Sequence, residues 1–384
     1  MRFTISKAGC GSERIGHLTG FFKSPNANIE TPAFGLLTQG GSVVHLTAEV
    51  LAKVFTNPQL LWVPLSNSIH LENGAKAQGE GLAKFAGLQE HVTCVTFNDM
   101  KESTPTGHIE SDKMPLWTKQ GKKMISADRY MDVMEIFKPD IILAIADSCT
   151  TLGEGVKRIS KSVDRTCSMF DKCVNRYKGS KQLQNSALIG FIPKHGDLVP
   201  NATPLSTKTL ITCQEMLYID QIPKDRVRFV EGCWDPVVIM AAIEQGWDIF
   251  DGSYTVNLTN AGKALVMNLD VTKNIDHMCI LDLNDERYKE DFRPVLEGCE
   301  CLTCKKHTRA YIRHLLNTRE MLSSVLLMDF NHSVTLDVLF ALRLLLVNNV
   351  NAFMQVNTDL VMNISRLNIA VIFFFCFAST LLCI

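Results

Sequence analysis

Short apolar runs alternate with segments of helical spacing along the middle of the chain. Residues 141–147 (IILAIAD) form a β-branched apolar run that ends in a polar residue, and residues 186–192 and 226–232 show the same pattern. Apolar runs of this length, bounded by polar or turn residues, predict buried strands. A further strand is predicted to start at residue 247.

Helical patterns lie between these runs. Residues 126–137 carry apolar side chains at helical spacing, and Ser126 is a candidate N-cap. Asp235 and Pro236 predict the start of another helix, which Gly246 ends. Strands and helices that alternate with short links indicate parallel pairing and an α/β architecture. Periodicity alone does not separate a closed barrel from an open doubly wound sheet.

Two carboxylates follow predicted strand ends, where α/β barrels place their chemistry. They are Asp147 and Asp251. A carboxylate at such a position can act on a substrate, or it can hold a turn in place. For Asp251 the structural interpretation is the favoured one.

Composition narrows the class of protein. The chain has 384 residues and 46% hydrophobic content, which is enough for one large domain or two ordinary ones. Lys and Arg (39) nearly balance Asp and Glu (40), so no overall basic field indicates nucleic acid, although a local patch is still compatible with it. The N-terminus lacks the pattern of a secretory signal, which predicts a cytosolic protein with reduced thiols.

The most informative motif is a tight group of cysteines. Cys299, Cys301 and Cys304 have C-x-C-x-x-C spacing, which allows three thiolates to surround one tetrahedral zinc ion. A structural zinc site needs a fourth ligand, usually Cys or His. The competing interpretation is three unrelated thiols in a turn, but such density is rare in a reduced protein.

A basic stretch follows the cysteines. Lys305, Lys306, Arg309 and Arg313 concentrate positive charge there, and Tyr311 adds an aromatic ring. These side chains are candidates for contact with the phosphates of an RNA backbone, as in tRNA. The alternative is a solvated basic helix face, which charge alone favours.

The C-terminus has a different character. Residues 367–384 carry no charge and are long enough to cross a bilayer. They are predicted either to anchor the chain in a membrane or to be a segment outside the ancestral fold without a membrane role.

The cysteine region also carries a family resemblance. C-x-C-x-x-C followed by HTRAYI-x-HLL and then LLM resembles the zinc region of tRNA-guanine transglycosylases. Residues 31–32, 40–47, 140–150, 161–166 and 242–251 resemble other parts of that family in the same order. The resemblance covers about residues 1–328, and it implies a TIM-like (β/α)8 barrel with an inserted zinc-binding subdomain at about residues 295–328, holding one Zn²⁺ per subunit.

The resemblance assigns roles to individual residues. The family exchanges a guanine at the tRNA wobble position for another 7-deazaguanine base through a covalent tRNA–enzyme intermediate. Asp251 lies where the family has its nucleophile, and Asp147 and Cys149 lie where the family offers an Asp and a Cys to the base. A second Asp in the family moves protons.

Several family motifs are missing from this chain. Residues 252–257 (GSYTVN) replace the Pro-Thr-Arg that follows the nucleophile. Residues 95–100 (VTFNDM) stand where the family has Asp-Ser-Gly-Gly-Phe-Gln with its proton-transfer Asp. Pro193 and Lys194 replace a Gln-Gly pair, and a Gly-Gly-Leu pocket wall has no match. This loss predicts that the chain is not catalytic by itself.

The fourth zinc ligand is open. The family places its zinc His twenty-six residues after the third Cys, a position that Phe330 occupies here. His332 is the nearest His, but two residues rotate a helical side chain by roughly 200°. His307, His314 and water are other candidates. Residues 329–384 are predicted to form a divergent tail.

Three functional classes remain. The first is a non-catalytic subunit that pairs with an active transglycosylase in a heterodimer and binds tRNA. The second is a self-sufficient enzyme that uses Asp251 with an unrecognised base. The third is a zinc-stabilised RNA-binding or membrane-tethered scaffold. The resemblance implies a cytosolic protein that can associate with the mitochondrial outer membrane.

Overall fold

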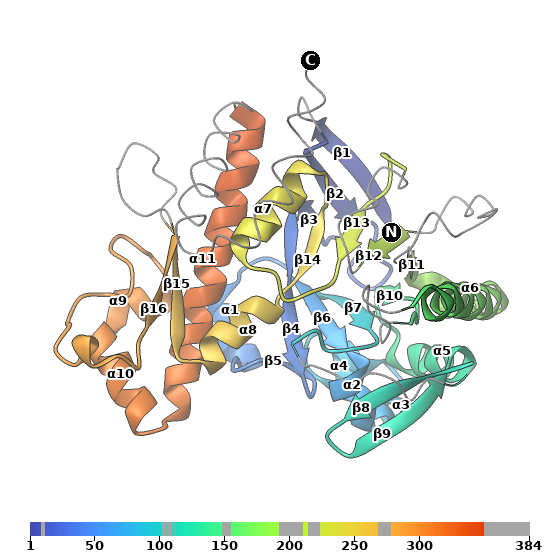
Figure 1. The fold of residues 1–384 in the computed structure, drawn as a ribbon, viewed down its shortest axis with the longest axis horizontal. Coiled ribbons are helices and arrows are strands. Elements are labelled where there is room, and N and C mark those ends of the chain that lie inside the picture. The colour runs from blue at the N-terminus through green and yellow to red at the C-terminus, as the bar shows by residue number, and fades with distance from the viewer. Residues whose placement is uncertain are drawn as a thin grey trace.

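The structure is a computed structural model of the chain. It describes residues 1–8, 12–101, 105, 110, 112–147, 155–191, 210–213, 223–267 and 278–348. These residues form a barrel, with a smaller subdomain on one side of it (Figure 1).

The barrel is a closed ring of parallel strands. The strands are, in order around the ring, β4 (Ala33–Gln39), β6 (Leu60–Pro64), β7 (Val92–Thr96), β10 (Ile141–Leu143), β11 (Ala187–Phe191), β12 (Leu210–Cys213), β13 (Arg228–Val230) and β14 (Ile249–Asp251). β14 pairs in parallel with β4, Asp251 lying opposite Gly35, and this pairing closes the ring. The predicted TIM-like barrel is confirmed.

Interior packing also links strands that are not neighbours. The rings of Trp62 on β6 and Phe229 on β13 lie 6.1 Å apart between centroids. Both side chains are fully buried. Gly35 on β4 makes room for this layer, because a Cβ there would stand 2.7 Å from the Trp62 ring. The interior is therefore a packed core rather than a channel.

Helices follow most of the barrel strands. They are α1 (Ala48–Val54), α2 (Leu65–Ser68), α3 (Glu72–Gln78), α4 (Leu82–Phe85), α5 (Ala127–Phe137), α6 (Val156–Gly179), α7 (Pro236–Glu244) and α8 (Ser253–Asn260). The predicted cap is confirmed, since Ser126 Oγ accepts from the Arg129 amide at 3.2 Å. α7 begins at Pro236 and is followed by Gly246 at φ 90°, as expected.

Smaller sheets attach to the barrel. β1 (Arg2–Ala8), β2 (Arg14–Thr19) and β3 (Ile29–Thr31) form an antiparallel sheet, β5 (Ser42–Val43) pairs with β4, and β8 (Lys113–Thr118) and β9 (Gly121–Ser126) form a hairpin. A buried ion pair fixes the first of these to the barrel. Arg14 Nε donates to Asp248 Oδ1 at 2.9 Å, and Asp248 directly precedes β14.

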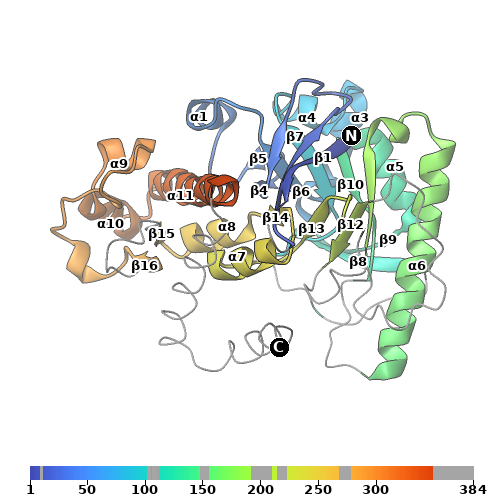
Figure 2. The ribbon, with the colours of Figure 1, turned by 90° about the horizontal axis from the view of Figure 1, so that it is seen from above.

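The subdomain lies on the side of the barrel opposite α5 and α6 (Figure 2). It contains β15 (Lys263–Met267), β16 (Met278–Asp282), α9 (Leu302–Lys306), α10 (Arg309–Asn317) and α11 (Met321–Asn348). α11 continues past residue 328 without a break. Phe330 and His332, which lie in the same helix after residue 328, are fully buried. The first part of the predicted tail is therefore continuous with the helix that supports the cysteines.

One described helix is long and apolar enough to cross a membrane. It covers Met321–Arg343, but 67% of the apolar window is buried inside the protein. Burial against the barrel and the subdomain accounts for this apolar composition without a membrane. Residues 367–384, the predicted membrane segment, lie outside the described residues, and their role stays a prediction.

Candidate functional site

The carboxyl ends of all barrel strands meet at one rim. Among the described residues, four acidic side chains lie there: Asp99 after β7, Asp147 after β10, Glu231 after β13 and Asp251 at the end of β14. All four are buried. Parallel closure therefore gathers carboxylates from four strands at the edge where barrels of this type carry out chemistry.

Asp251 is enclosed by backbone. Its two carboxylate oxygens accept from the Gly232 amide at 2.6 Å and from the Ser253 amide at 2.9 Å. Burial raises the pKa of Asp251 to about 6, although these hydrogen bonds favour the charged form. The carboxylate thus joins the turns after β13 and β14, which is the structural role favoured from the sequence.

Glu231 is a second carboxyl group, close enough to Asp251 for the two charges to interact. The sequence interpretation missed it. Its Oε1 accepts a short hydrogen bond from the Thr96 hydroxyl. Burial raises the pKa of Glu231 to about 8, and the nearby Asp251 charge contributes to the rise. Glu231 is therefore mostly protonated at neutral pH. Its charged side chain near the end of the apolar run 226–232 was the signal that could have identified it.

Asp99 is the third carboxylate of the group. Its Oδ2 accepts from Asn67 Nδ2 at 3.1 Å and its Oδ1 from the Lys101 amide at 3.0 Å. Its charge is one cause of the raised pKa of Asp251. Asp99 lies within residues 95–100, which showed no family match, so the sequence pattern gave no reason to single it out.

Asp147 is paired rather than open. Arg165 on α6 donates to Asp147 Oδ2 from Nε at 3.1 Å and from Nη2 at 2.5 Å. The Asp147 side chain is fully buried beneath this arginine. The other predicted base-pocket residue, Cys149, lies outside the described residues.

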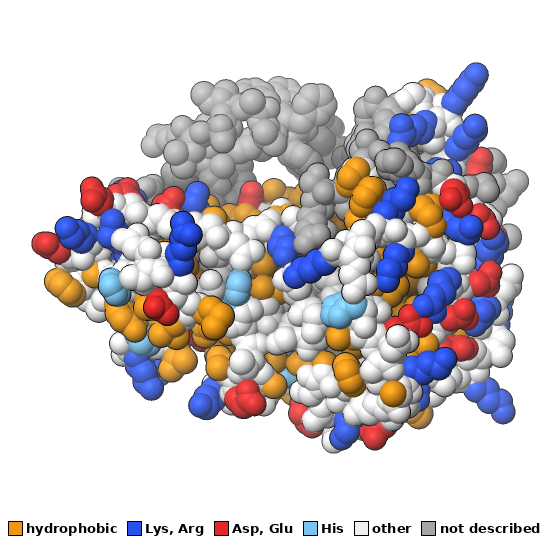
Figure 3. All heavy atoms as spheres, turned by 90° about the horizontal axis from the view of Figure 1, so that it is seen from below, with side chains coloured by type: hydrophobic (Ala, Val, Ile, Leu, Met, Phe, Trp, Pro, Cys, Tyr) orange, Lys and Arg blue, Asp and Glu red, His pale blue; other side chains and the backbone are white. Residues whose placement is uncertain are grey.

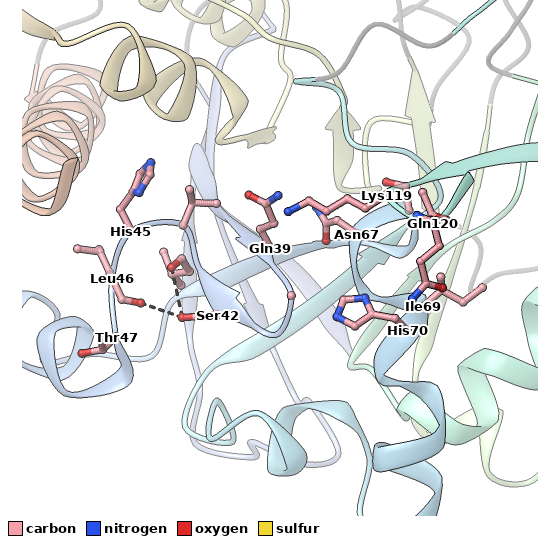
Figure 4. Close-up of a pocket in the computed structure, with 15 residues that line it drawn as sticks. Gln39, Ser42, His45, Leu46, Thr47, Asn67, Ile69, His70, Lys119 and Gln120 are labelled. Carbon is pink, nitrogen blue, oxygen red and sulfur yellow. Dashed lines mark hydrogen bonds between the residues drawn. The ribbon is translucent and has the colours of Figure 1, made fainter. Parts of the chain in front are cut away.

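A cavity of about 570 Å³, lined by both polar and apolar side chains, opens beside β4, α2 and the β8–β9 hairpin (Figure 4). Gln39, His45, Asn67 and His70 line it. Two buried polar atoms in the lining, Ser66 Oγ and Asn67 Oδ1, have no hydrogen-bond partner among the described residues. Because buried polar atoms are normally paired, this cavity suits a polar ligand or ordered water. The sequence interpretation had not identified it.

The structure brings the three predicted cysteines together. The sulfur atoms of Cys299, Cys301 and Cys304 lie within 4.8 Å of one another. Cys301 caps α9 by accepting from the Cys304 amide at 3.3 Å. Hydrogen bonds from Cys301 and Cys304 lower the pKa of Cys299 from its usual value. Three sulfurs bound to one zinc stand ~3.8 Å apart, so this cluster could hold a metal ion.

His332 is not part of this group. Its ring packs edge-on against Phe34, and its Nδ1 lies 3.5 Å from Thr255 Oγ1, so it faces β4 and α8. The helical rotation noted in the sequence is the physical reason. Burial lowers the pKa of His332 to about 3. Phe330, at the family's ligand position, is fully buried and offers no donor.

The other histidines near the cysteines have their own surroundings. His307 follows α9, and its ring stacks on Tyr311 with centroids 5.2 Å apart. His314 lies in α10 and is exposed. Neither belongs to the group of metal-competent donor atoms in the described residues.

The four predicted tRNA-contact residues differ in exposure and partners. Arg309 is mostly buried and binds the carbonyl oxygens of Pro294 and Val295 at 3.0 and 2.9 Å. Arg313 binds a backbone carbonyl at 2.9 Å, and Lys305 pairs with Glu300 at 2.6 Å. Lys306 is exposed, and within the described part of the chain it is the one of the four without such a contact. Most of this basic stretch therefore holds the subdomain together.

The raised pKa of Glu231 predicts that the stability of the folded chain depends on pH. Its pKa in the folded chain is about 8, against a usual value of 4.5, so folding becomes less favourable as pH rises between these values. Glu231→Gln keeps the acceptor for Thr96 and removes the ionisation. The variant should gain about 1–4 kcal/mol over the parent between pH 5 and pH 8, measured by urea unfolding. An equal difference at both pH values would contradict the assignment.

The sequence of this chain is similar to those of known proteins. The family model for queuine tRNA-ribosyltransferase matches residues 10–214 and 206–355, and so continues past residue 328. Queuine tRNA-ribosyltransferase accessory subunit 2 of Anopheles gambiae is 33% identical over 362 residues, covering 86% of this chain and 84% of the relative. The protein of that name from Drosophila sechellia is 34% identical over 368 residues, covering 86% and 85%. The chain belongs to the queuine tRNA-ribosyltransferase family.

Proposed function

We propose that this chain is the non-catalytic accessory subunit of a heterodimeric queuine tRNA-ribosyltransferase. It supports the exchange of guanine for queuine at the tRNA wobble position (34), while a catalytic partner carries out the displacement. The names of its relatives supply the class of partner and substrate. The state of Asp251 is the observation that carries the non-catalytic part of the proposal.

A nucleophile must be ionised and must reach the ribose carbon. Asp251 is 2% exposed, and both of its oxygens are bound to backbone amides, so the carboxylate is not free to reach a ribose carbon. A neighbouring carboxyl group, Glu231, has a raised pKa. These features suit a buried structural carboxylate better than an attacking group.

Asp147 supports the same interpretation. A carboxylate that reads a base needs free acceptor oxygens in an open pocket. Here Arg165 binds the Asp147 carboxylate and covers it, so its charge is already compensated. A base entering this region would have to displace a buried salt bridge, which is costly.

The metal is proposed to be zinc, one ion per chain. Cys299, Cys301 and Cys304 supply three thiolates, and water or another donor completes the site. The bound metal would organise the subdomain rather than take part in exchange. Asp329 assists by accepting from the Thr303 amide and hydroxyl at 2.9 and 2.8 Å, which ties α9 to α11.

Replacing one thiolate should remove the metal. Cys301→Ser is expected to lose most bound zinc and to unfold at a lower temperature, because binding energy in a structural site is folding energy. Cys233→Ser is the matched control, since Cys233 is exposed and outside the cluster. Elemental analysis and thermal unfolding test this. Full zinc occupancy in the Cys301 variant would rule out the site.

One observation favours a self-sufficient enzyme as the second candidate. Asp99 lies close enough to Asp251 to affect its ionisation, so two carboxylates do face the rim. In that case Asp251 would attack and Asp99 would move protons. A third class is a zinc-stabilised scaffold, either free in the cytosol or tethered to the mitochondrial outer membrane through residues 367–384. Alkaline carbonate extraction of the chain with and without that segment tests the tether.

An exchange assay separates these classes. Alone, the chain should not incorporate queuine, whereas the pair with a catalytic subunit should. Asp251→Asn in this chain should leave the rate of the pair within about twofold, because Asp251 takes no part in the reaction under this proposal. A group that acts in general acid–base catalysis commonly contributes about 10² to 10⁴ in rate, so its loss would be much larger. Asp→Asn at the partner's own nucleophile is the matched control and should abolish exchange. Turnover by the lone chain that disappears in Asp251→Asn would overturn the proposal.

A further inference from the structure

The tip of the β8–β9 hairpin carries a concentrated positive charge. Lys119, Lys122 and Lys123 lie within five residues at and beside the turn, and all three are exposed. None of them forms an ion pair within the described residues, whereas Lys113 at the base of the hairpin pairs with Glu110 at 3.3 Å. The hairpin tip (Lys119, Lys122 and Lys123) thus presents uncompensated cations.

These cations adjoin the cavity at the rim. Lys119 lines the cavity of about 570 Å³, and its side chain extends over it toward Gln39 and Asn67 (Figure 4). Lys123 lines a second cavity of about 430 Å³. Ile69, His70 and Gln120 line both, so the two cavities adjoin along the hairpin.

The surroundings do not cancel this charge. The first cavity has no acidic residue in its described lining. The second has Glu72, but Arg129 binds its two oxygens at 2.8 and 2.5 Å. The face of the molecule seen from below mixes basic, acidic and apolar side chains, and its described residues show no broad basic field (Figure 3).

An anionic polymer fits these features better than a small anion. Successive residues of a strand point to opposite faces, so Lys122 and Lys123 direct charge to both sides of the hairpin. Such spread cations can contact several phosphates of one chain, each contact releasing counterions. The two adjoining cavities, whose linings offer both polar and apolar side chains, would accept sugars and bases without demanding one sequence.

We propose that the hairpin tip is a phosphate-binding arm that holds the tRNA backbone at the barrel rim. This inference rests on the proposed function for its ligand. It moves the main RNA contact from the basic stretch after the cysteines, where Arg309 and Arg313 bind backbone carbonyls, to β8 and β9.

The test is tRNA binding by the complex of this chain with its catalytic partner. Changing Lys119, Lys122 and Lys123 together to Gln should raise the Kd at least ~10-fold and lower the slope of log K against log salt by about 2, as for loss of three contacts. The control changes Lys53, Lys76 and Lys84 to Gln, which removes the same charge from exposed positions on α1, α3 and α4. The control should retain parental affinity and slope.

Two further measurements keep the outcomes separate. Lys119→Arg should retain affinity while Lys119→Gln weakens it, and thermal unfolding should be equal for both. If the unmodified pair shows no exchange, the proposed function fails whatever the binding data. If the pair is active but the triple variant and the control bind tRNA equally, the hairpin is not the arm. A loss confined to Lys306→Gln would return the contact to the subdomain and overturn the inference.

Discussion

The pairing of β14 with β4 is the constraint on which the site depends. It closes a ring of parallel strands, and closure places the carboxyl end of each strand at one rim. Residues 99 and 251, more than 150 positions apart in sequence, come within electrostatic reach only for this reason. The same pairing puts Gly35 opposite Asp251, and a Cβ at the next residue, Gly252, would stand 2.4 Å from the Gly35 carbonyl oxygen. Little space is left around the carboxylate.

The acidic residues at the rim are each bound, protonated or covered by another side chain. Asp251 is bound to backbone, Glu231 is largely protonated and Asp147 is covered by Arg165. Buried charges are stable only when they are paired or neutralised, and each of these groups follows one of those routes. A catalytic rim needs the opposite condition, an ionised group open to substrate. The cavity beside the hairpin is open, and its mixed polar and apolar lining suits the binding of a ligand.

Much of the architecture could be predicted because its signals are local. β-branched runs located β10, β11 and β13, Ser126 located the start of α5, and cysteine spacing located the metal-competent cluster. The failures concern direction and distance. His332 turns toward Phe34 because α11 continues unbroken, and Arg309 turns inward to backbone carbonyls. Neither orientation is encoded in residue type. The cavity, and the grouping of Asp99 and Glu231 with Asp251, depend on contacts between distant strands, which no single segment reveals.

The identity of the chain that becomes covalently joined to tRNA tests the central claim most directly. During exchange the attacking carboxylate forms a bond to the ribose, so a denaturing gel of the trapped pair shows which subunit carries the RNA. The account predicts label on the catalytic partner alone, with the same yield when this chain carries Asp251→Asn. RNA attached to this chain, and lost in Asp251→Asn, would contradict it.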